Sequence, residues 1–131
     1  MARKRRILII EDNETLRDSL RRALVKRGYE VVATSSAEEG LGIVLGHLFD
    51  VILVDLKLPR NDGDSFIRQV RALGCRSEIV MMTGFADGDI SSAMQKIGAR
   101  ATVIKEADFL EKILTTVADV LSSPQQLAET A

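Results

Sequence analysis

The sequence predicts an α/β protein in which a doubly wound, five-stranded parallel sheet is flanked by five helices. Three observations lead to this fold class. Five short apolar runs are separated by segments that have the periodicity of amphipathic helices. The runs are apolar almost throughout, which is typical of strands buried on both faces. Strands that alternate with helices favour parallel pairing and right-handed crossovers, so helices are expected on both faces of the sheet.

The first half of the chain contains three of the predicted strands and two of the helices. The strands are expected over Arg6–Ile10, Glu30–Ala33 and Val51–Val54. The buried face of the first helix is marked by Leu16, Leu20, Ala23 and Leu24. Asn13 is suited to cap the start of that helix and Gly28 to end it. Ser36 is expected to cap a second helix that runs to about Leu45.

The second half continues the alternation. The remaining strands are expected over Ile79–Met82 and Ala101–Ile104. A helix before the first of these strands turns Phe66, Ile67 and Val70 inward, and another, between the two strands, runs near Ile90–Ile97 until Gly98 ends it. The last helix extends from about Asp108 to Leu121, with a buried stripe of Leu110, Ile113, Leu114, Val117 and Leu121. Residues 1–121 are therefore interpreted as one domain, and residues 122–131 as a tail or the start of a linker.

Composition excludes several classes of protein. The 131 residues contain one cysteine and one histidine, Cys75 and His47, so an internal disulfide and a zinc site built from one chain are excluded. No apolar run approaches the ~20 residues that span a membrane, and no signal peptide is visible. We therefore expect a cytoplasmic domain with no membrane association.

Charge is unevenly distributed along the chain. The first 27 residues hold nine Lys and Arg against four Asp and Glu, although the whole chain has a net charge of −1. A basic segment of this kind is either a solvated face of the first helix or a docking surface for an acidic partner or for nucleic acid. Nucleic acid is the weaker interpretation, because the total is not basic and no reading helix follows.

Polar residues of particular types follow four of the five apolar runs. Those residues are Glu11 and Asp12, Asp55, Thr83 and Lys105. In open parallel sheets, ligands bind where the carboxyl ends of the strands meet. One acid or threonine at a strand end is usually a cap or turn residue. Capping does not explain this whole set, so we expect a site at that edge.

The chemistry that fits this set is metal-assisted phosphoryl transfer. Clustered carboxylates suit a hard cation such as Mg²⁺, which offsets their mutual repulsion and neutralises charge on an incoming phosphoryl group. One of the carboxylates can then attack phosphorus and hold it as an acyl phosphate. Thr83 can donate a hydrogen bond to a phosphoryl oxygen, and Lys105 can serve as a mobile positive charge.

These residues resemble the receiver domain of bacterial two-component response regulators over about residues 5–121. The matching motifs are Glu11-Asp12, Val54-Asp55-Leu56-Lys57-Leu58-Pro59, Asp62-Gly63, Thr83-Gly84 and Lys105. The resemblance implies a flavodoxin-like fold with strand order 2-1-3-4-5. It also implies that Asp55 accepts a phosphoryl group from a sensor histidine kinase or a histidine phosphotransfer protein.

The resemblance further implies a Mg²⁺ site. Asp12, Asp55 and the backbone carbonyl of Lys57 would bind the ion, and Glu11 would act mainly through metal-bound water. Lys57 and Phe85 would lie beside the phosphoryl group and tune its lifetime. We expect Phe85 to restrict the attacking water, so that self-dephosphorylation is slower with Phe85 than after Phe85→Ala.

Two positions depart from the family pattern. Proline normally follows the lysine through a cis peptide, but here Glu106 follows Lys105. A cis bond without proline costs about 2.5–4 kcal/mol, so a trans bond is expected. The Glu106 carboxylate would also compete for the Lys105 ammonium. The second departure is Thr102, which stands where the family carries a switching aromatic residue. The usual switch is therefore in doubt, and a non-aromatic output route is expected.

The resemblance also suggests partners. The first helix, with Arg17, Arg21 and Arg22 exposed, would meet the phosphodonor. The fourth helix, fifth strand and fifth helix would contact a downstream output domain or protein, or a second copy in a homodimer. Direct nucleic-acid binding by this domain is not expected.

Two other functions stay open at this point. One is a degenerate receiver that binds partners without phosphorylation, which Thr102 and Glu106 favour. The other is an aspartyl-phosphate hydrolase resembling the haloacid dehalogenase family. Such enzymes carry a second aspartate two residues after the nucleophile. Lys57 stands there instead, and the chain leaves no room for a substrate cap. We therefore expect no enzyme beyond self-catalysed phosphoryl transfer and dephosphorylation.

Overall fold

The computed structural model describes residues 3–56, 63–84 and 88–122. Its five strands form one parallel sheet in the order β2-β1-β3-β4-β5, as expected. The strands are β1 (Arg6–Ile10), β2 (Glu30–Thr34), β3 (Val51–Asp55), β4 (Glu78–Thr83) and β5 (Ala101–Ile104). The helices are α1 (Glu14–Lys26), α2 (Ala37–Gly46), α3 (Gly63–Ala72), α4 (Gly88–Ile97) and α5 (Phe109–Ser122).

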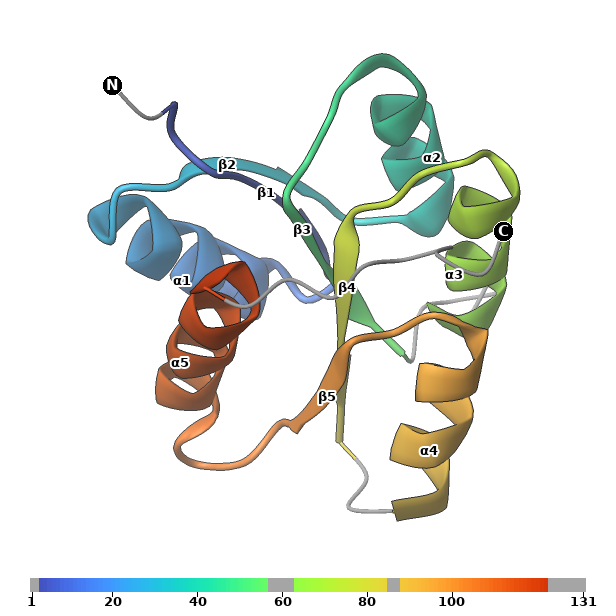
Figure 1. Ribbon diagram of the computed structural model, residues 1–131. Coiled ribbons are helices and arrows are strands. Elements are labelled where there is room, and N and C mark those ends of the chain that lie inside the picture. The colour runs from blue at the N-terminus through green and yellow to red at the C-terminus, as the bar shows by residue number, and fades with distance from the viewer. Residues whose placement is uncertain (1–2, 57–62, 85–87, 123–131) are drawn as a thin grey trace.

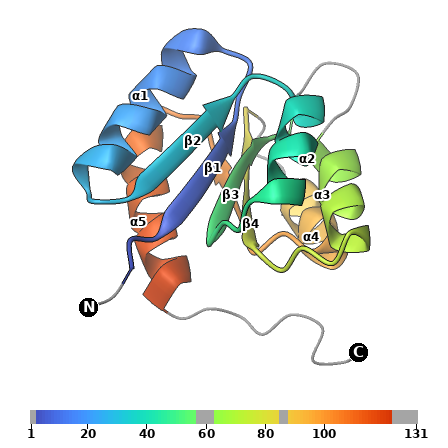
Figure 2. The ribbon, with the colours of Figure 1, turned by 90° about the horizontal axis from the view of Figure 1, so that it is seen from above.

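The helices cover both faces of the sheet. Figures 1 and 2 show α1 and α5 on one face and α2, α3 and α4 on the other. Along the described ranges, none of the helices is both long and apolar enough to span a bilayer.

Local sequence determines where several helices begin and end. The Asn13 side chain accepts a hydrogen bond from the backbone N–H of Leu16 at 2.9 Å, and Ser36 caps α2 in the same way. Gly28, just past α1, has a φ of 95°, and Gly98, just past α4, has a φ of 120°. Side chains rarely adopt this backbone conformation, so the two glycines end their helices as the sequence predicted.

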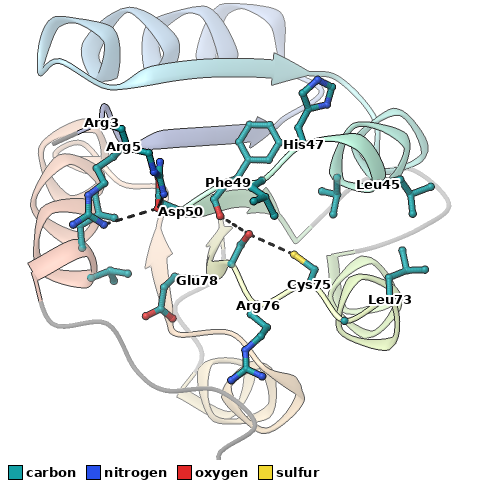
Figure 3. Close-up of a pocket in the computed structure, with 16 residues that line it drawn as sticks. Arg3, Arg5, Leu45, His47, Phe49, Asp50, Leu73, Cys75, Arg76 and Glu78 are labelled. Atoms are coloured by element: carbon teal, nitrogen blue, oxygen red, sulfur yellow. Dashed lines mark hydrogen bonds and ion pairs between the residues drawn. The ribbon is translucent and has the colours of Figure 1, made fainter. Parts of the chain in front are cut away.

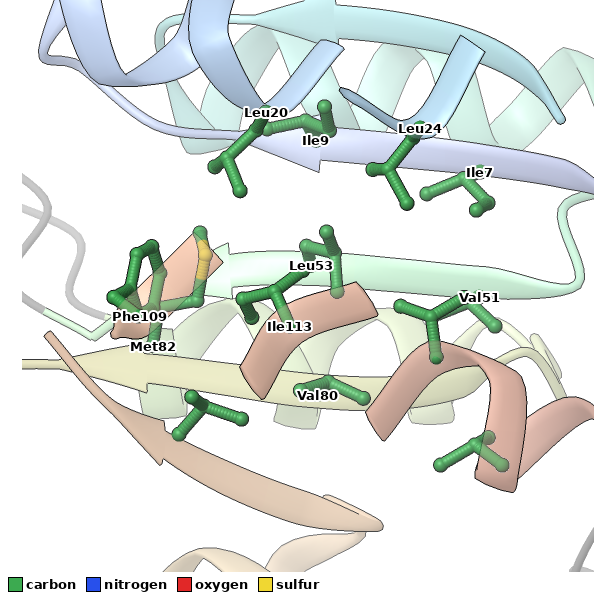
Figure 4. Packing of buried hydrophobic residues seen from close by; sticks show 13 residues of the cluster. Ile7, Ile9, Leu20, Leu24, Val51, Leu53, Val80, Met82, Phe109 and Ile113 are labelled. Atoms are coloured by element: carbon green, nitrogen blue, oxygen red, sulfur yellow. The ribbon is translucent and has the colours of Figure 1, made fainter. Parts of the chain in front are cut away.

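Each face of the sheet has its own hydrophobic core. On one face, Leu20 and Leu24 of α1 lie next to Ile9 and Ile7 of β1, while Ile113 of α5 packs over β3 (Figure 4). On the other face, the predicted residues of α3 are fully buried: Phe66, Ile67 and Val70. Gly40 lets α2 lie close to the sheet, because an added Cβ would stand 2.5 Å from Ile10 Cδ1. Burial on both faces explains why the strands are so uniformly apolar.

The predicted stripe of α5 was partly wrong. Leu110 is 36% exposed, whereas Phe109 and Val120 are buried. The helix begins at Phe109, whose ring turns toward the sheet. The buried face of the helix therefore starts at Phe109 rather than at Leu110. Some strands also extend past their apolar runs. The polar residues Thr34 and Glu78 still pair through their backbones with the neighbouring strands, so they belong to β2 and β4.

Strand register brings the carboxyl ends of the central strands together. Asp55 at the end of β3 is paired with Met82 of β4, and Thr83 is paired with Ile104 of β5. The backbone N–H of Lys105 donates to the carbonyl of Thr83 at 2.6 Å. Residues that are up to about a hundred positions apart in sequence therefore meet at one edge of the sheet.

Candidate functional site

Three carboxylates meet at the carboxyl edge of the sheet. Glu11 and Asp12 directly follow β1, and Asp55 ends the adjacent strand β3. One oxygen of each carboxylate lies within 4.8 Å of the others. Glu11 is 1% exposed and Asp55 3% exposed, whereas Asp12 is open to solvent. The predicted acidic cluster is thus present, with two buried members and one at the mouth.

Lys105 connects these carboxylates. Its Nζ lies 2.9 Å from Glu11 Oε1 and 3.3 Å from Asp55 Oδ2. The side chain extends from just beyond β5, past the end of β4, to the ends of β1 and β3. A single ammonium therefore offsets much of the repulsion between Glu11 and Asp55.

The site shifts the pKa values of two of its members. Burial raises the pKa of Glu11 above its ordinary value, and the nearby Asp55 charge adds to this, although Lys105 and the Asn13 N–H act in the opposite direction. Burial alone would lower the pKa of Lys105. The hydrogen bond and charge of Glu11, with the charge of Asp55, outweigh burial, so the pKa of Lys105 is raised. Lys105 therefore remains a cation around neutral pH.

Backbone and helix contacts hold the loop that carries Glu11 and Asp12. The Asn13 N–H donates to Glu11 Oε2 at 3.1 Å, and the Glu11 N–H donates to the Thr34 carbonyl at 3.0 Å. Arg17 Nη1 donates to the carbonyls of Glu11 at 2.9 Å and Asp12 at 3.4 Å. These contacts fix the backbone of the acidic pair from the side of α1.

The role of Arg17 was missed from the sequence, where it was predicted to be exposed. It is half-buried and folds back over the loop before α1. A signal was available, because side chains in the first turn of a helix lean toward its N-terminus. Arg21 and Arg22 are exposed as predicted, and both pair with Asp18.

Thr83 is buried at the same edge. It is the last residue of β4, 1% exposed, and its carbonyl accepts from the Lys105 N–H. Glu11, Asp12, Asp55, Thr83 and Lys105 therefore all lie where the strand ends predicted them. Lys57 and Phe85, the two predicted tuning residues, lie outside the described residues, and so does the Lys57 carbonyl.

The two departures from the family pattern have different outcomes. The bond between Lys105 and Glu106 is trans, as predicted. The prediction that Glu106 competes for Lys105 was wrong, because Glu106 Oε2 pairs with Lys112 Nζ at 3.2 Å. Glu106 therefore pairs with Lys112 of α5, while Lys105 pairs with Glu11 and Asp55. Thr102 is half-buried, and within the described parts of the chain its buried hydroxyl has no hydrogen-bond partner.

The acidic cluster suits a divalent cation of the Mg²⁺ type. Its ligand atoms are all carboxylate oxygens, which are the donors that hard cations prefer. Magnesium usually takes one or two protein carboxylates and keeps several waters, and the exposed position of Asp12 leaves the mouth open to water. The 4.8 Å spread is also compatible with a direct bond to some oxygens and a water-mediated bond to others.

Comparisons with known proteins agree with the fold and with the family resemblance. The family model described as the response regulator receiver domain matches residues 7–118. The sensory/regulatory protein RpfC of Xanthomonas campestris (strain 8004) is 32% identical over 98% of this chain. The response regulator MprA of Mycobacterium sp. (strain KMS) is 31% identical over 92% of it. The chain spans 18% of the length of RpfC and 53% of that of MprA.

Solved structures resemble the whole domain. The receiver domain protein (CheY-like) from Methanospirillum hungatei JF-1 is 29% identical, with a TM-score of 0.84 over 92% of this chain and 95% of that one. The response regulator protein TrrA of Thermotoga maritima, solved in complex with Mg²⁺-BeF, is similar in fold. Its TM-score is 0.78 at 22% identity over 88% of this chain and 98% of that one.

Proposed function

The chain belongs to the receiver domain family of response regulators, and from this we propose that Asp55 accepts a phosphoryl group in two-component signalling. The donor would be a sensor histidine kinase or a histidine phosphotransfer protein. The observation that carries the proposal is the buried Asp55 carboxylate, flanked by Glu11 and Asp12 and contacted by the Lys105 ammonium. This arrangement supplies a nucleophile together with cationic and metal-binding partners.

The transfer itself is a substitution at phosphorus. A carboxylate oxygen of Asp55 forms a bond to phosphorus while the phosphorus–nitrogen bond of the donor phosphohistidine breaks. The electron pair of that bond stays on the imidazole nitrogen, which takes up a proton. The product is an acyl phosphate on Asp55. No oxidant or reductant takes part.

Asp12, Asp55 and, by family resemblance, the Lys57 carbonyl would hold Mg²⁺, with Glu11 acting through metal-bound water. When bound, Mg²⁺ would supply positive charge that lowers the repulsion between the acidic site and the incoming phosphoryl group. The carboxylate-only donor set supports this choice of cation.

Thr83 and Lys105 would stabilise the phosphorylated state. The Thr83 hydroxyl would donate a hydrogen bond to one phosphoryl oxygen. The Lys105 ammonium would move from the Asp55 carboxylate to another phosphoryl oxygen. The 3.3 Å distance between Lys105 Nζ and Asp55 Oδ2 supports this role for Lys105. Self-catalysed dephosphorylation would remove the phosphoryl group from Asp55, and Phe85 and Lys57 would set the rate of this removal. Faster loss of the phosphoryl group after Phe85→Ala is the expected sign of that tuning.

Signalling would proceed through surfaces rather than through an enzymatic product. The phosphodonor would dock on α1, where Arg21 and Arg22 are exposed. The face formed by α4, β5 and α5 would contact an output domain or protein, or a second copy of the chain. These partners follow from family membership. The same membership disfavours the hydrolase alternative.

A phosphorylation-independent receiver is the second candidate function. The observation that favours it is Thr102, a half-buried threonine at the position where the family carries its switching aromatic residue. In that case partners would bind without phosphorylation of Asp55. Such a domain could keep the acidic cluster as a structural feature.

Intact-protein mass spectrometry separates the two candidates at the first step. The chain is incubated with acetyl phosphate in the presence of Mg²⁺ or of a chelator, beside Asp55→Asn. We expect an added mass of about 80 Da, one phosphoryl group, in wild type with Mg²⁺ and in neither control. No adduct under conditions that label another receiver domain would overturn the proposal and favour the second candidate.

A further inference from the structure

A groove of about 560 Å³ lies at the opposite edge of the sheet from the carboxylates. It is formed where β1, β3 and β4 begin and where α2, α3 and α5 end. Figure 3 shows Leu45 of α2 and Leu73 beyond α3 on one side, with Arg3, Arg5 and Asp50 on the other. Nothing in the proposed phosphoryl chemistry uses this edge.

The groove gathers exposed apolar side chains. Leu45 is 69% exposed, Leu48 85% and Leu73 54%. Among the described residues five large hydrophobic side chains are exposed, and three of them line this groove. Phe49 and Val120, which are buried, add further apolar surface to the lining. Clustered exposed leucines indicate a surface that another molecule covers.

The rim of the groove is basic. Arg3, Arg5 and Arg76 contribute three guanidinium groups, against the carboxylates of Asp50 and Glu78. Asp50 accepts from both terminal nitrogens of Arg3 and from the Arg6 N–H, and its Oδ1 also lies 3.9 Å from Arg5 Nη1. Arg3 and Arg5 therefore share one carboxylate, and Glu78 accepts from Arg100, outside the groove lining, at 2.7 Å. The groove therefore presents apolar surface beside more guanidinium groups than carboxylates.

We propose that this groove binds an acidic amphipathic helix of a partner protein. A helix places apolar residues in a row at i, i+3, i+4 and i+7, and that row would cover Leu45, Leu48 and Leu73. Glu and Asp beside the row would face Arg3, Arg5 and Arg76. The match between a basic rim and an acidic helix selects this occupant.

Other occupants match the groove less well. Residues 123–131 follow α5 directly, but their sequence offers one acidic side chain, Glu129, and one large apolar side chain, Leu127. A second copy of the chain lacks a suitable face among its described residues. Its other exposed large hydrophobics, Val25 and Leu110, lie singly on α1 and α5.

The test uses the full chain and designed peptides. The probe is a peptide of about 18 residues, or five helical turns, with leucines in one helical row and glutamates beside it. One comparison peptide has the same composition with the leucines scattered, and another has lysine in place of glutamate. Backbone amide shifts in NMR locate the binding site, and a titration gives the affinity.

Groove variants are paired with matched controls. Leu48→Ser and Arg5→Glu change exposed positions of the groove. Val25→Ser in α1 and Arg27→Glu just past it make the same changes at exposed positions away from the groove. We expect saturable binding only of the peptide that carries leucines in one row and glutamates beside it. The backbone amide shifts should change around the groove. Each groove variant should weaken it by about tenfold or more, as loss of a central contact does, and the controls should not. Added salt should also weaken it.

Several outcomes would overturn the proposal. The first is equal binding of the scattered or basic peptide, and the second is unchanged affinity in the groove variants. A concentration-dependent dimer that Leu48→Ser dissociates would assign the groove to a second copy. Peptide binding that appears only after removal of residues 123–131 would assign it to the tail. Asp55→Asn should bind the peptide like wild type, so the result is independent of the proposed phosphorylation.

Discussion

The Lys105 ammonium lies 2.9 Å from Glu11 Oε1, closer than the 3.3 Å that separates it from Asp55 Oδ2. Glu11 thus takes the shorter of the two contacts, although Asp55 is the proposed phosphoacceptor. The ammonium occupies the acidic cluster in which a divalent cation would also bind. Lys105 and Mg²⁺ are therefore expected to compete for the same negative charge.

Replacing Lys105 by methionine tests this competition. The variant should lose about 1–3 kcal/mol of unfolding free energy without Mg²⁺, because Glu11 and Asp55 would face each other uncompensated. This is less than a fully buried pair would lose, since the Lys105 side chain is 24% exposed. Millimolar Mg²⁺ should restore more stability to the variant than to wild type. Urea unfolding with and without Mg²⁺ measures both effects.

Lys112→Met is the matched control. Lys112 also pairs with two carboxylates, Glu106 and Asp108, but on the exposed surface of α5. Exposed pairs contribute little, so this variant should unfold like wild type with the same response to Mg²⁺. Equal losses in the two variants, or an equal gain from Mg²⁺, would show that the Lys105 cluster is not a shared cation site.

Asp12 provides a test of metal binding that leaves the core intact. Because Asp12 is exposed, Asp12→Asn should fold normally while binding Mg²⁺ about tenfold or more weakly. Glu14→Gln, two residues further along, removes the same charge outside the cluster and should change the affinity much less. Calorimetric titration with Mg²⁺ measures the difference. Identical affinities would place the cation elsewhere.

The ionisation of the Asp50 carboxyl should make the free energy of unfolding depend on pH. Burial alone would raise the pKa of Asp50, but the hydrogen bonds from Arg3 and the Arg6 N–H outweigh it, so that pKa lies below 3.8. The carboxylate therefore stabilises the fold above that pH, and the benefit disappears as pH falls through the lower folded-state pKa.

The comparison is between wild type and Asp50→Asn. Near neutral pH, wild type should be more stable by about 1–2 kcal/mol, because a charge-assisted hydrogen bond is lost. The gap should narrow as pH falls below about 4, the ordinary pKa of aspartate. Urea unfolding across this range gives the gap at each pH. A gap that stays constant would mean that the charge of Asp50 does not matter.

Two glycines of α2 make opposite predictions. Gly40→Ala would place a Cβ 2.5 Å from Ile10 Cδ1 in the buried core, so overpacking should offset the gain in helix propensity. Gly42→Ala has open space and should stabilise the fold by up to about 1 kcal/mol. Thermal unfolding should rank Gly42→Ala above Gly40→Ala. The reverse order would mean that the core yields easily at Ile10.

The sequence was informative wherever one physical rule dominated. Apolar runs predicted all five strands, because both faces of the sheet are covered and the strand interiors are almost entirely apolar. Asn13 and Ser36 predicted two helix starts, because their side chains satisfy the first backbone N–H groups. The residues of the candidate site were predictable because strand ends are easily located in a parallel sheet.

The remaining features depend on contacts that the sequence does not encode locally. The inward fold of Arg17 depends on carbonyls that the turn after β1 presents to it. The pairing of Glu106 with Lys112 depends on where α5 begins. The groove leucines lie in α2, beyond α2 and beyond α3, so only the assembled fold brings them together.

Mapping the phosphoryl group to one residue is the most direct test of the proposed function. After labelling with acetyl phosphate and Mg²⁺, borohydride reduces an aspartyl phosphate to homoserine, which peptide mass spectrometry locates. We predict homoserine at position 55 in wild type and none in Asp55→Asn. Homoserine at Asp12 or another aspartate, a reduced glutamyl side chain at Glu11 or another glutamate, or no reduced residue in a chain that has gained the phosphoryl mass would contradict Asp55 as the acceptor.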